Sequence, residues 1–344
     1  DQVGWLPFAV LAIVRAHRRS PLAAVVSSSS PVTAHLAAGI ARRLLGIAWI
    51  ADFRDPWLDN PIEPRPGRLT QWRRRVVETW IVRSADRCTF ATPSLAETYR
   101  RRYPRAAGRM DLVPNGYDRA ELGTPAASRS RRKRRSAGPV RLVYAGSLYR
   151  PAELETFLLG VRRLMGRRDV SDRLRVDFVG TVTDASRAIA DRQLVEEPGL
   201  EAIVAFHGFV PREEALRRIA EADAALTLLG AGPGMEMFVG AKLFDYIGLD
   251  RPILAVVPPG DAGRVLADLG WGIAADPTPE GVADGLSRLI DDPAAAAGRT
   301  GRADPEGRYD RRRTAALLGE LLRCSVEGAD PAWGSRSNAA SDRP

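Results

Sequence analysis

The sequence predicts an α/β protein built from two Rossmann-like domains. The chain has 344 residues, and about 150 residues per domain suggests two of them. Short apolar runs alternate with helical patterns along most of the chain, which is typical of parallel sheets with helices on both faces. One strongly basic segment separates two such blocks. Ligands bind at the carboxyl ends of the strands in such folds, so we expect two sheets that face a central cleft.

The first block predicts a four-stranded domain over residues 1–122. Pro114, Asn115 and Gly116 follow its last strand and form a turn by composition. The expected strands are 22–27, 47–51, 87–91 and 110–113, and the expected helices are 32–45, 68–85 and 94–103.

The second block predicts a six-stranded domain over residues 139–305. A further helix is expected within 306–327, and a disordered tail over 328–344. The expected strands are 140–145, 175–179, 202–206, 224–228, 252–256 and 272–275, and the expected helices are 152–165, 185–195, 212–220, 242–247, 262–269, 279–290 and 311–322.

The formal charge of +9 comes mainly from one short run between the blocks. Residues 129–135 contain five arginines and Lys133, and without these six charges the balance is 9 − 6 = +3. Ser, Ala, Gly and Pro flank the run, so we expect a solvated linker over 123–138. Contact with a polyanion is the alternative, but the charge of the rest of the chain does not indicate a nucleic-acid partner.

Several classes of site are excluded by the sequence. Cys88 and Cys324 are the only cysteines, and three histidines are scattered, so neither a disulfide framework nor a Cys/His zinc site is expected. No apolar window is long enough to predict a membrane-spanning helix. The chain contains no D-x-D and no G-x-S-x-G sequence, so it lacks the usual metal clamp for a nucleotide diphosphate and the serine-hydrolase turn.

Two elements of the second block could bind an anion. Gly146 lies between a strand and a helix, where backbone N–H groups can approach an anion and the helix dipole contributes about 0.3–1 kcal/mol; a plain tight turn is the alternative. Lys242, one of two lysines in the chain, begins another helix and could meet a phosphate as a point charge. Asp245 lies on the same helix face and could accept hydrogen bonds from ribose hydroxyls, unless it forms a surface ion pair with Lys242.

An ordered set of short motifs runs through both blocks of the chain. The motifs of the first block are Ser27-Ser28-Ser29-Ser30-Pro31, Trp49-Ile50-Ala51-Asp52-Phe53-Arg54-Asp55-Pro56-Trp57, Ala85-Asp86 and Pro114-Asn115-Gly116-Tyr117-Asp118. Those of the second block are Tyr144-Ala145-Gly146-Ser147, His207-Gly208-Phe209-Val210 and Lys242-Leu243-Phe244-Asp245-Tyr246. Taken together, and in this order over about residues 5–295, the set resembles the family 4 glycosyltransferases.

The resemblance implies a GT-B fold and a retaining, hexosyltransferase-type enzyme of bacterial polysaccharide biosynthesis. Domain 1–122 would be the acceptor side and domain 139–305 would bind a nucleotide-diphosphate sugar, which is a co-substrate; no metal and no cofactor are implied. The acceptor would be a glycan or a lipid-linked molecule. Carried over by position, the donor-binding residues are Gly146, Ser147, Arg150, Gly208, Val210, Lys242, Leu243 and Asp245.

In this interpretation Arg150 and Lys242 neutralise the diphosphate, Asp245 binds the ribose, and Gly208 and Val210 hold the nucleobase. Electrostatic stabilisation of the departing diphosphate is the expected main contribution to the rate. A nucleotide-sugar epimerase of the same fold, and an inactive fragment or polyanion-binding protein, are the alternatives.

The chain departs from the family pattern at three places. Met237 stands where the family has the first acid of an E-x₇-E motif, and Glu236 is one position away. Asp52, Arg54 and Asp55 stand near the place of a family histidine. They are the candidate catalytic residues if they orient an acceptor hydroxyl, and otherwise they brace the site through a salt bridge. The family's first strand and acceptor loop are missing, so we expect an N-terminally incomplete chain.

Two further features each allow two interpretations. His35 is expected to be a packed helix residue rather than a catalytic base. Leu69, Trp72, Val76 and Trp80 recur at helical spacing beside Arg73, Arg74 and Arg75. Core packing is expected for this stripe, and contact with an anionic membrane is the alternative. The expected location is the cytoplasm, or the inner face of the plasma membrane as a peripheral protein.

Overall fold

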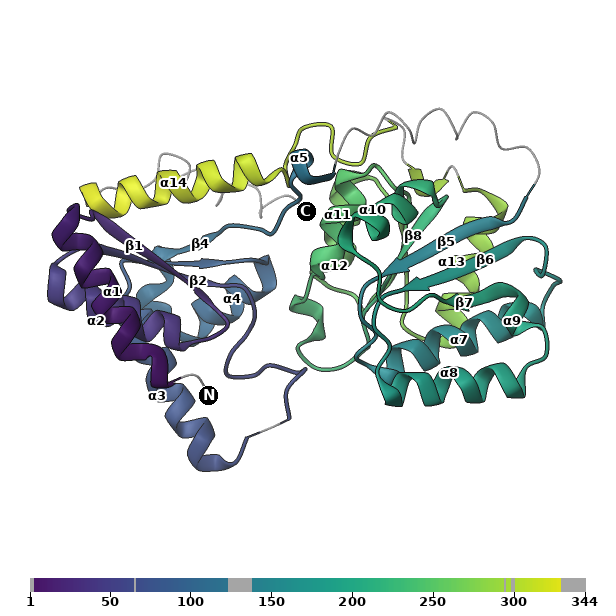
Figure 1. Cartoon of the computed structure of the whole chain (residues 1–344), viewed down its shortest axis with the longest axis horizontal. Helices are drawn as coiled ribbons and strands as arrows, with labels where there is room; N and C mark the ends of the chain where they lie inside the picture. Colours follow the sequence, from purple (N-terminus) through teal and green to yellow (C-terminus); the bar gives the residue numbers. More distant parts are fainter. Residues whose placement is uncertain (1–2, 65, 123–137, 294, 298–300, 329–344) are drawn as a thin grey trace. The chain divides into compact units, whose positions relative to one another are not determined.

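The computed structural model describes residues 3–64, 66–122, 138–293, 295–297 and 301–328 (Figure 1). The chain divides into two compact units, the first formed by Asp1–Pro114 with Arg312–Pro344 and the second by Asn115–Arg311. Each unit contains one parallel sheet, so the predicted α/β class with two Rossmann-like domains is confirmed. The predicted basic linker and the tail lie almost wholly outside the described residues.

The first unit is built on a four-stranded sheet in the order β1-β2-β3-β4. The register pairs Ser28 of β1 with Asp52 of β2, and Asp52 with Thr89 of β3, so three polar side chains lie side by side near the ends of these strands. The strands are β1 (Ala24–Ser29), β2 (Ala48–Phe53), β3 (Arg87–Phe90) and β4 (Met110–Leu112). The helices are α1 (Leu6–Arg19), α2 (Thr33–Leu45), α3 (Arg68–Ser84), α4 (Pro93–Arg102) and α14 (Arg311–Glu327).

Two helices of the first unit differ from expectation. No element was expected before residue 22, whereas α1 lies there and packs along α2 without burying any of its own residues. The predicted last helix runs on to Glu327, and it packs against the first unit through Leu321, which is buried with Ile50 and Val113. The helical pattern of α14 could not show which unit the helix packs against, because that depends on a tertiary contact.

The apolar stripe of α3 packs against the core only near its carboxyl end, where Trp80 is half-buried. Trp80 packs against Trp49, with their ring centroids 6.0 Å apart. The exposed fractions of Leu69, Trp72 and Val76 are 61%, 61% and 49%, so the expectation of core packing is wrong for these three residues. The first half of α3 projects beyond the sheet, where no other element covers it in the described part of the chain (Figure 1).

The second unit is built on a six-stranded sheet in the order β10-β9-β8-β5-β6-β7. The chain runs outward from β5 to β6 and β7 and then returns to the other side of β5 to form β8, so the strand order reverses between β5 and β8. The strands are β5 (Val140–Ala145), β6 (Leu174–Val179), β7 (Val204–Phe206), β8 (Ala224–Leu228), β9 (Ile253–Val256) and β10 (Ile273–Ala275). The helices include α5 (Arg119–Leu122), α7 (Pro151–Met165), α8 (Asp184–Glu196), α9 (Leu200–Ile203), α10 (Arg212–Glu221), α11 (Ala241–Gly248), α12 (Asp261–Leu269) and α13 (Pro279–Asp291).

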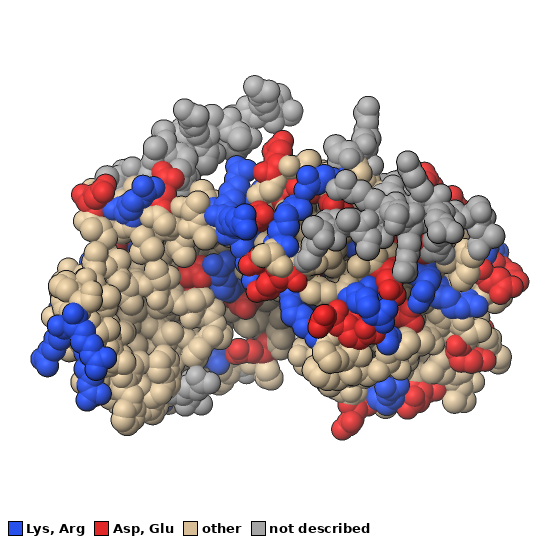
Figure 2. Space-filling view, turned by 45° about the horizontal axis from the view of Figure 1, so that its top comes forward, with Lys and Arg blue, Asp and Glu red and all other residues tan. Residues whose placement is uncertain are grey.

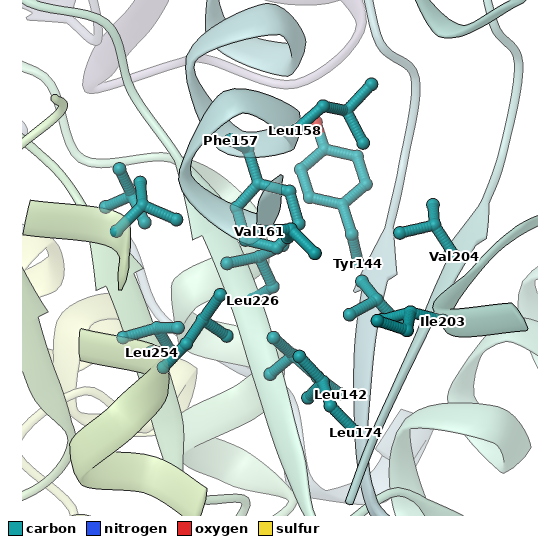
Figure 3. Close-up of a cluster of buried hydrophobic side chains, with 14 of the residues drawn as sticks. Leu142, Tyr144, Phe157, Leu158, Val161, Leu174, Ile203, Val204, Leu226 and Leu254 are labelled. Atoms are coloured by element: carbon teal, nitrogen blue, oxygen red, sulfur yellow. The ribbon is translucent and has the colours of Figure 1, made fainter. Parts of the chain in front are cut away.

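Helices cover both faces of this sheet. One buried cluster joins the sheet to α7, α8 and α13, and the other joins it to α10, α11 and α12. Figure 3 shows part of the first cluster, in which Phe157 and Val161 of α7 lie over Leu226 of β8 and Tyr144 of β5 lies beside them. Tyr144 is therefore fixed by the core, and its hydroxyl group lies at the carboxyl end of β5.

One predicted strand is shorter than expected. The prediction of a strand over 202–206 is wrong at its start, because Leu200–Ile203 form the short helix α9. Gly199 has a φ of +95° and begins this turn, and Leu200 and Ile203 are buried beneath it. The apolar run is therefore shared between a helical turn and a strand.

Candidate functional site

Three loops meet at the carboxyl ends of β5, β6 and β7. Gly146 follows β5 with a φ of +141°, and its N–H donates to the carbonyl of Val179 at 2.7 Å. Gly180 follows β6 with a φ of +139°, and its N–H donates to the carbonyl of Gly208 at 2.8 Å. A Cβ at Gly180 would lie 2.3 Å from the carbonyl oxygen of Gly146, so the backbones approach too closely for a side chain.

Lys242 lies directly against Gly146. A Cβ added to Gly146 would lie 1.9 Å from Cε and 2.5 Å from Nζ of the lysine. The ammonium group donates to the hydroxyl of Tyr144 at 2.7 Å and lies 4.2 Å from the centroid of its ring. Within the described part of the chain, none of the carboxylates forms an ion pair with Lys242. Since Tyr144 is held by the core, the ammonium is fixed at the carboxyl end of β5.

Burial lowers the pKa of Lys242 to about 8, and the carboxylate of Glu153 opposes this effect. Burial also raises the pKa of Tyr144 above its ordinary value. The tyrosine therefore stays neutral and can accept from the ammonium while it donates to the carbonyl of Ser147 at 3.1 Å. The site holds a cation that is poorly compensated, which is the property expected of an anion-binding lysine.

Glu153 connects α7, which follows β5, to the loop after β8. These are the two strands between which the strand order reverses. Glu153 lies in the first turn of α7, and its Oε1 accepts from the N–H of Gly230, after β8, at 2.8 Å. The same oxygen lies 3.2 Å from Nη1 of Arg150, the residue that precedes α7. Burial raises the pKa of Glu153, and the Gly230 N–H, Arg150 and Lys242 oppose the rise.

Arg150 has a second partner besides the carboxylate of Glu153. Its Nη1 also donates to Sδ of Met235 at 3.3 Å. Glu153 was not predicted from the sequence; an acid three residues after Arg150 at a helix start was the available signal. Glu236 is exposed and Met237 is buried, and a sugar contact by Glu236 stays untested.

The remaining predicted donor residues are placed differently from one another. Asp245 pairs with Arg212 of α10 through two contacts of 3.2 Å, so the Lys242–Asp245 ion pair is not formed. Leu243 is buried in the core, and Val210 packs against the same cluster. Gly208 has a φ of +71°, and nothing occupies the position of its absent side chain. The structure thus brings Gly146, Ser147, Arg150 and Lys242 together and links Gly208 to them through Gly180.

Polar side chains of the first unit form a hydrogen-bonded network around the carboxylate of Asp52. This carboxylate accepts from Arg54 Nε at 2.6 Å, from Thr89 Oγ1 at 2.7 Å and from Ser28 Oγ at 2.9 Å. Arg54 also donates to the carbonyl of Val113 at 3.1 Å. Asp52 is only 3% exposed, whereas Asp55 is exposed. This arrangement favours the bracing interpretation for Asp52 and Arg54, and a catalytic role of the three residues stays a prediction.

His35 is a packed residue, as expected. It is fully buried, its Nδ1 lies 2.7 Å from Oγ of Ser27, and its ring centroid lies 4.8 Å from that of Phe53. Burial lowers its pKa to about 4, with Asp52 opposing, so the ring is neutral at physiological pH.

The described residues contain neither a metal-binding cluster nor a helix that could span a membrane. No cluster of three or more His, Cys, Asp or Glu side chains is placed there to hold a metal ion. Among the helices of this part of the chain, none is both long enough and apolar enough to cross a membrane.

Comparison with known proteins gives a domain match for the first third of the chain. Residues 1–116 match the family described as glycosyl transferase 4-like domain. None of the curated protein sequences matches the chain.

Solved structures match nearly the whole chain at low identity. Sucrose-phosphate synthase from Thermosynechococcus elongatus aligns with a TM-score of 0.71 at 19% identity, covering 96% of this chain and 80% of the other. HepE from Anabaena in complex with UDP aligns with a TM-score of 0.68 at 17% identity, covering 92% and 82%. The UDP-forming α,α-trehalose-phosphate synthase from Burkholderia vietnamiensis aligns with a TM-score of 0.64 at 13% identity, covering 96% and 78%. Residues 1–116 therefore match a glycosyl transferase 4-like domain, and the chain has the GT-B fold.

Proposed function

We propose that the chain transfers a hexose-type sugar, with retention of configuration, from a nucleotide-diphosphate sugar to a glycan or lipid-linked acceptor. The observation that carries this proposal is the buried ammonium of Lys242 against the side-chain-free face of Gly146. Burying a cation without a carboxylate partner is costly, and an incoming anion offsets that cost. A diphosphate is the anionic part of the proposed donor.

The diphosphate contacts Gly146, Ser147, Arg150 and Lys242. The backbone at Gly146 can approach it closely, and the positive end of α7 begins one residue after Arg150. As the bond between the sugar and the diphosphate breaks, negative charge grows on the leaving diphosphate. Arg150 and Lys242 then stabilise the transition state more than the bound donor, which is the requirement for a rate increase.

The other carried-over residues have supporting roles in this proposal. Asp245 binds the ribose after its ion pair with Arg212 rearranges, and Gly208 and Val210 contact the base through their backbone. Leu243 is buried, so it fixes the start of α11 and does not touch the donor. Asp52 and Arg54 brace the acceptor unit, and Asp55, which is exposed, can face the acceptor.

Neutralisation by side chains replaces a metal ion in the proposed mechanism. The sequence lacks a D-x-D pair, and Arg150 and Lys242 supply the positive charge instead. The first donor to test is UDP-glucose, because HepE, which shares the fold, has been solved with UDP-glucose. Cys88 and Cys324 are free, which is consistent with the proposed reducing location in the cytoplasm.

Calorimetric titration with UDP-, GDP- and ADP-sugars, with and without EDTA, tests the proposal. One of the donors should bind, EDTA should change nothing, and Lys242→Met should weaken binding at least tenfold. Lys133→Gln, the other lysine of the chain, is the matched control and should bind like the wild type. Equal affinity of both variants would remove the phosphate role from Lys242. Product analysis with and without an acceptor distinguishes transfer from epimerisation.

A further inference from the structure

The first half of α3 presents an apolar stripe that nothing covers in the described part of the chain. Leu69, Trp72 and Val76 are spaced by three and four residues, so they lie on one face of the helix. At about 100° per residue, Arg73 lies on one side of this stripe, and Arg68 and Arg75 lie on the other. We call these six residues the α3 face.

The arginines of the α3 face have no acidic partner among the described residues. No Asp or Glu occurs between residues 64 and 77, and among the described residues none of the carboxylates pairs with Arg68, Arg73 or Arg75. The nearest acids in the sequence are engaged elsewhere: Glu63 pairs with Arg74 at 3.0 Å, and Glu78 is buried.

Charged side chains of the second unit are arranged differently. On the face shown in Figure 2, acidic and basic side chains are interspersed over this unit. Many charged side chains of the second unit form ion pairs, for example Arg167 with Asp284 at 2.7 Å and Arg217 with Glu221 at 2.8 Å. The α3 face therefore combines charge of one sign with exposed apolar area, and this combination determines what it can bind.

A cavity of about 860 Å³ adjoins the α3 face. Thr70, Arg73, Arg74 and Val77 of α3 form one wall, and Leu36 and Trp57 are among the residues that line the rest. Arg73 therefore stands between the apolar stripe and the cavity. A flat anionic surface in contact with the stripe would lie beside the mouth of this cavity.

We propose that the α3 face docks onto the surface of an anionic lipid bilayer, with α3 lying in the plane of the interface. Trp72 and the aliphatic side chains enter the headgroup boundary, while the flanking arginines keep their charges among the anionic headgroups. A second copy of the chain is a poorer occupant, because a symmetric contact would set arginine against arginine. A nucleic acid would leave the apolar stripe exposed to water.

Co-sedimentation with vesicles tests this proposal on the full chain. One set of vesicles contains phosphatidylcholine alone, and the other mixes it with phosphatidylglycerol. The wild type should bind the anionic vesicles and bind them less in high salt, because the attraction is screened. Replacing Arg68, Arg73 and Arg75 together by Gln should weaken binding on the order of 100-fold. Replacing Leu69, Trp72 and Val76 together by Ser should weaken it at least tenfold.

Matched controls separate the α3 face from other surfaces. Val195→Ser removes a side chain that is 83% exposed on α8, and Arg313→Gln with Arg323→Gln removes two exposed charges on α14. Both controls should bind vesicles like the wild type. A third variant replaces the basic residues of 129–135 by Gln, because that run could bind an anionic surface by itself; the proposal expects most of the binding to remain.

Three results would overturn the proposal. Vesicle binding could be unchanged in both α3 variants, it could be lost only when the 129–135 run is neutralised, or ultracentrifugation could show that the Ser variant converts a dimer into a monomer. The last result would assign the face to a second copy of the chain. Lys242→Met should keep vesicle binding, so failure of the donor-site proposal and failure of this one are distinguishable.

Discussion

Binding of the donor should transfer a proton to Lys242. The pKa of this lysine is about 8 in the free protein, against an ordinary value of 10.5. The difference of about 2.5 pH units corresponds to roughly 3 kcal/mol in favour of the neutral amine. A diphosphate at Gly146 and Arg150 favours the ammonium form and raises the pKa again. The free protein is half neutral at this residue at pH 8, so binding there should take up about half a proton.

The same reasoning fixes how the affinity depends on pH. With a pKa at or above the ordinary value in the complex, uptake is about 0.1 proton at pH 7 and about 0.9 proton at pH 9. The dissociation constant should therefore rise about tenfold between pH 7 and pH 9. Tyr144 keeps its proton over this range because burial raises its pKa.

Titration calorimetry of UDP-glucose in HEPES and in Tris measures the uptake, because the two buffers differ in ionisation enthalpy and neither supplies a competing phosphate. The observed heats should differ by the uptake multiplied by that difference. In Lys242→Met the difference should disappear. If the wild type gave equal heats in the two buffers at pH 8, or if binding released a proton, the assignment of the diphosphate to Lys242 would be refuted.

The free energy of unfolding of the free protein should rise with pH, whereas the affinity for the donor falls. The folded-state pKa of Lys242 lies below the unfolded value, so the unfolded chain binds more protons between pH 8 and about 10.5. The penalty for burying the ammonium is complete below pH 8 and disappears as the pH rises through this window. The free energy of unfolding of the wild type, relative to Lys242→Met, should rise by up to roughly 3 kcal/mol over it.

Three substitutions test other parts of the structure. Gly146→Ala should abolish measurable binding of UDP-glucose in calorimetry, because its Cβ would lie 1.9 Å from Cε of Lys242 and a φ of +141° is unfavourable for alanine; retained affinity would show that the loop is not needed in this form. Glu78→Ala should lower the free energy of unfolding, measured by urea denaturation, by about 3–5 kcal/mol. The reason is that the buried carboxylate accepts from Arg102 at 2.8 Å and from two tyrosines. A loss of stability below about 1 kcal/mol would contradict this. Asp52→Asn should cost about 1–3 kcal/mol of stability with donor affinity unchanged; normal stability with lost turnover would instead indicate catalysis.

Local patterns predicted most elements of the fold well. Strand β5 begins and ends where the sequence predicts it, α7 begins one residue earlier than expected, and α13 ends one residue later. A parallel sheet buried on both faces requires continuous apolar runs, and helices on its surface require a 3.6-residue period, so both leave a signal in the sequence. The short helix α9 was missed because a single helical turn within an apolar run has no distinct period.

The candidate site was predictable in part. Gly146 and Lys242 stood out because a glycine at a strand end and a rare lysine at a helix start are unusual residues in identifiable places. Glu153 was missed, since its function depends on its contact with Gly230, 77 residues away in the chain. Asp245 shares a helix with Lys242, yet its ion-pair partner Arg212 comes from another helix, which no spacing within α11 could indicate.

The sequence by itself determined the two parallel sheets, the order of their elements and the kind of residue at each strand end, because periodicity and turn chemistry are local properties. Only the tertiary structure decided that Lys242 lies against Gly146 with no carboxylate partner in the described part of the chain, and that Leu69, Trp72 and Val76 remain exposed. Desolvation and exposure depend on what packs around a group. The neighbours that decide them come from distant parts of the chain.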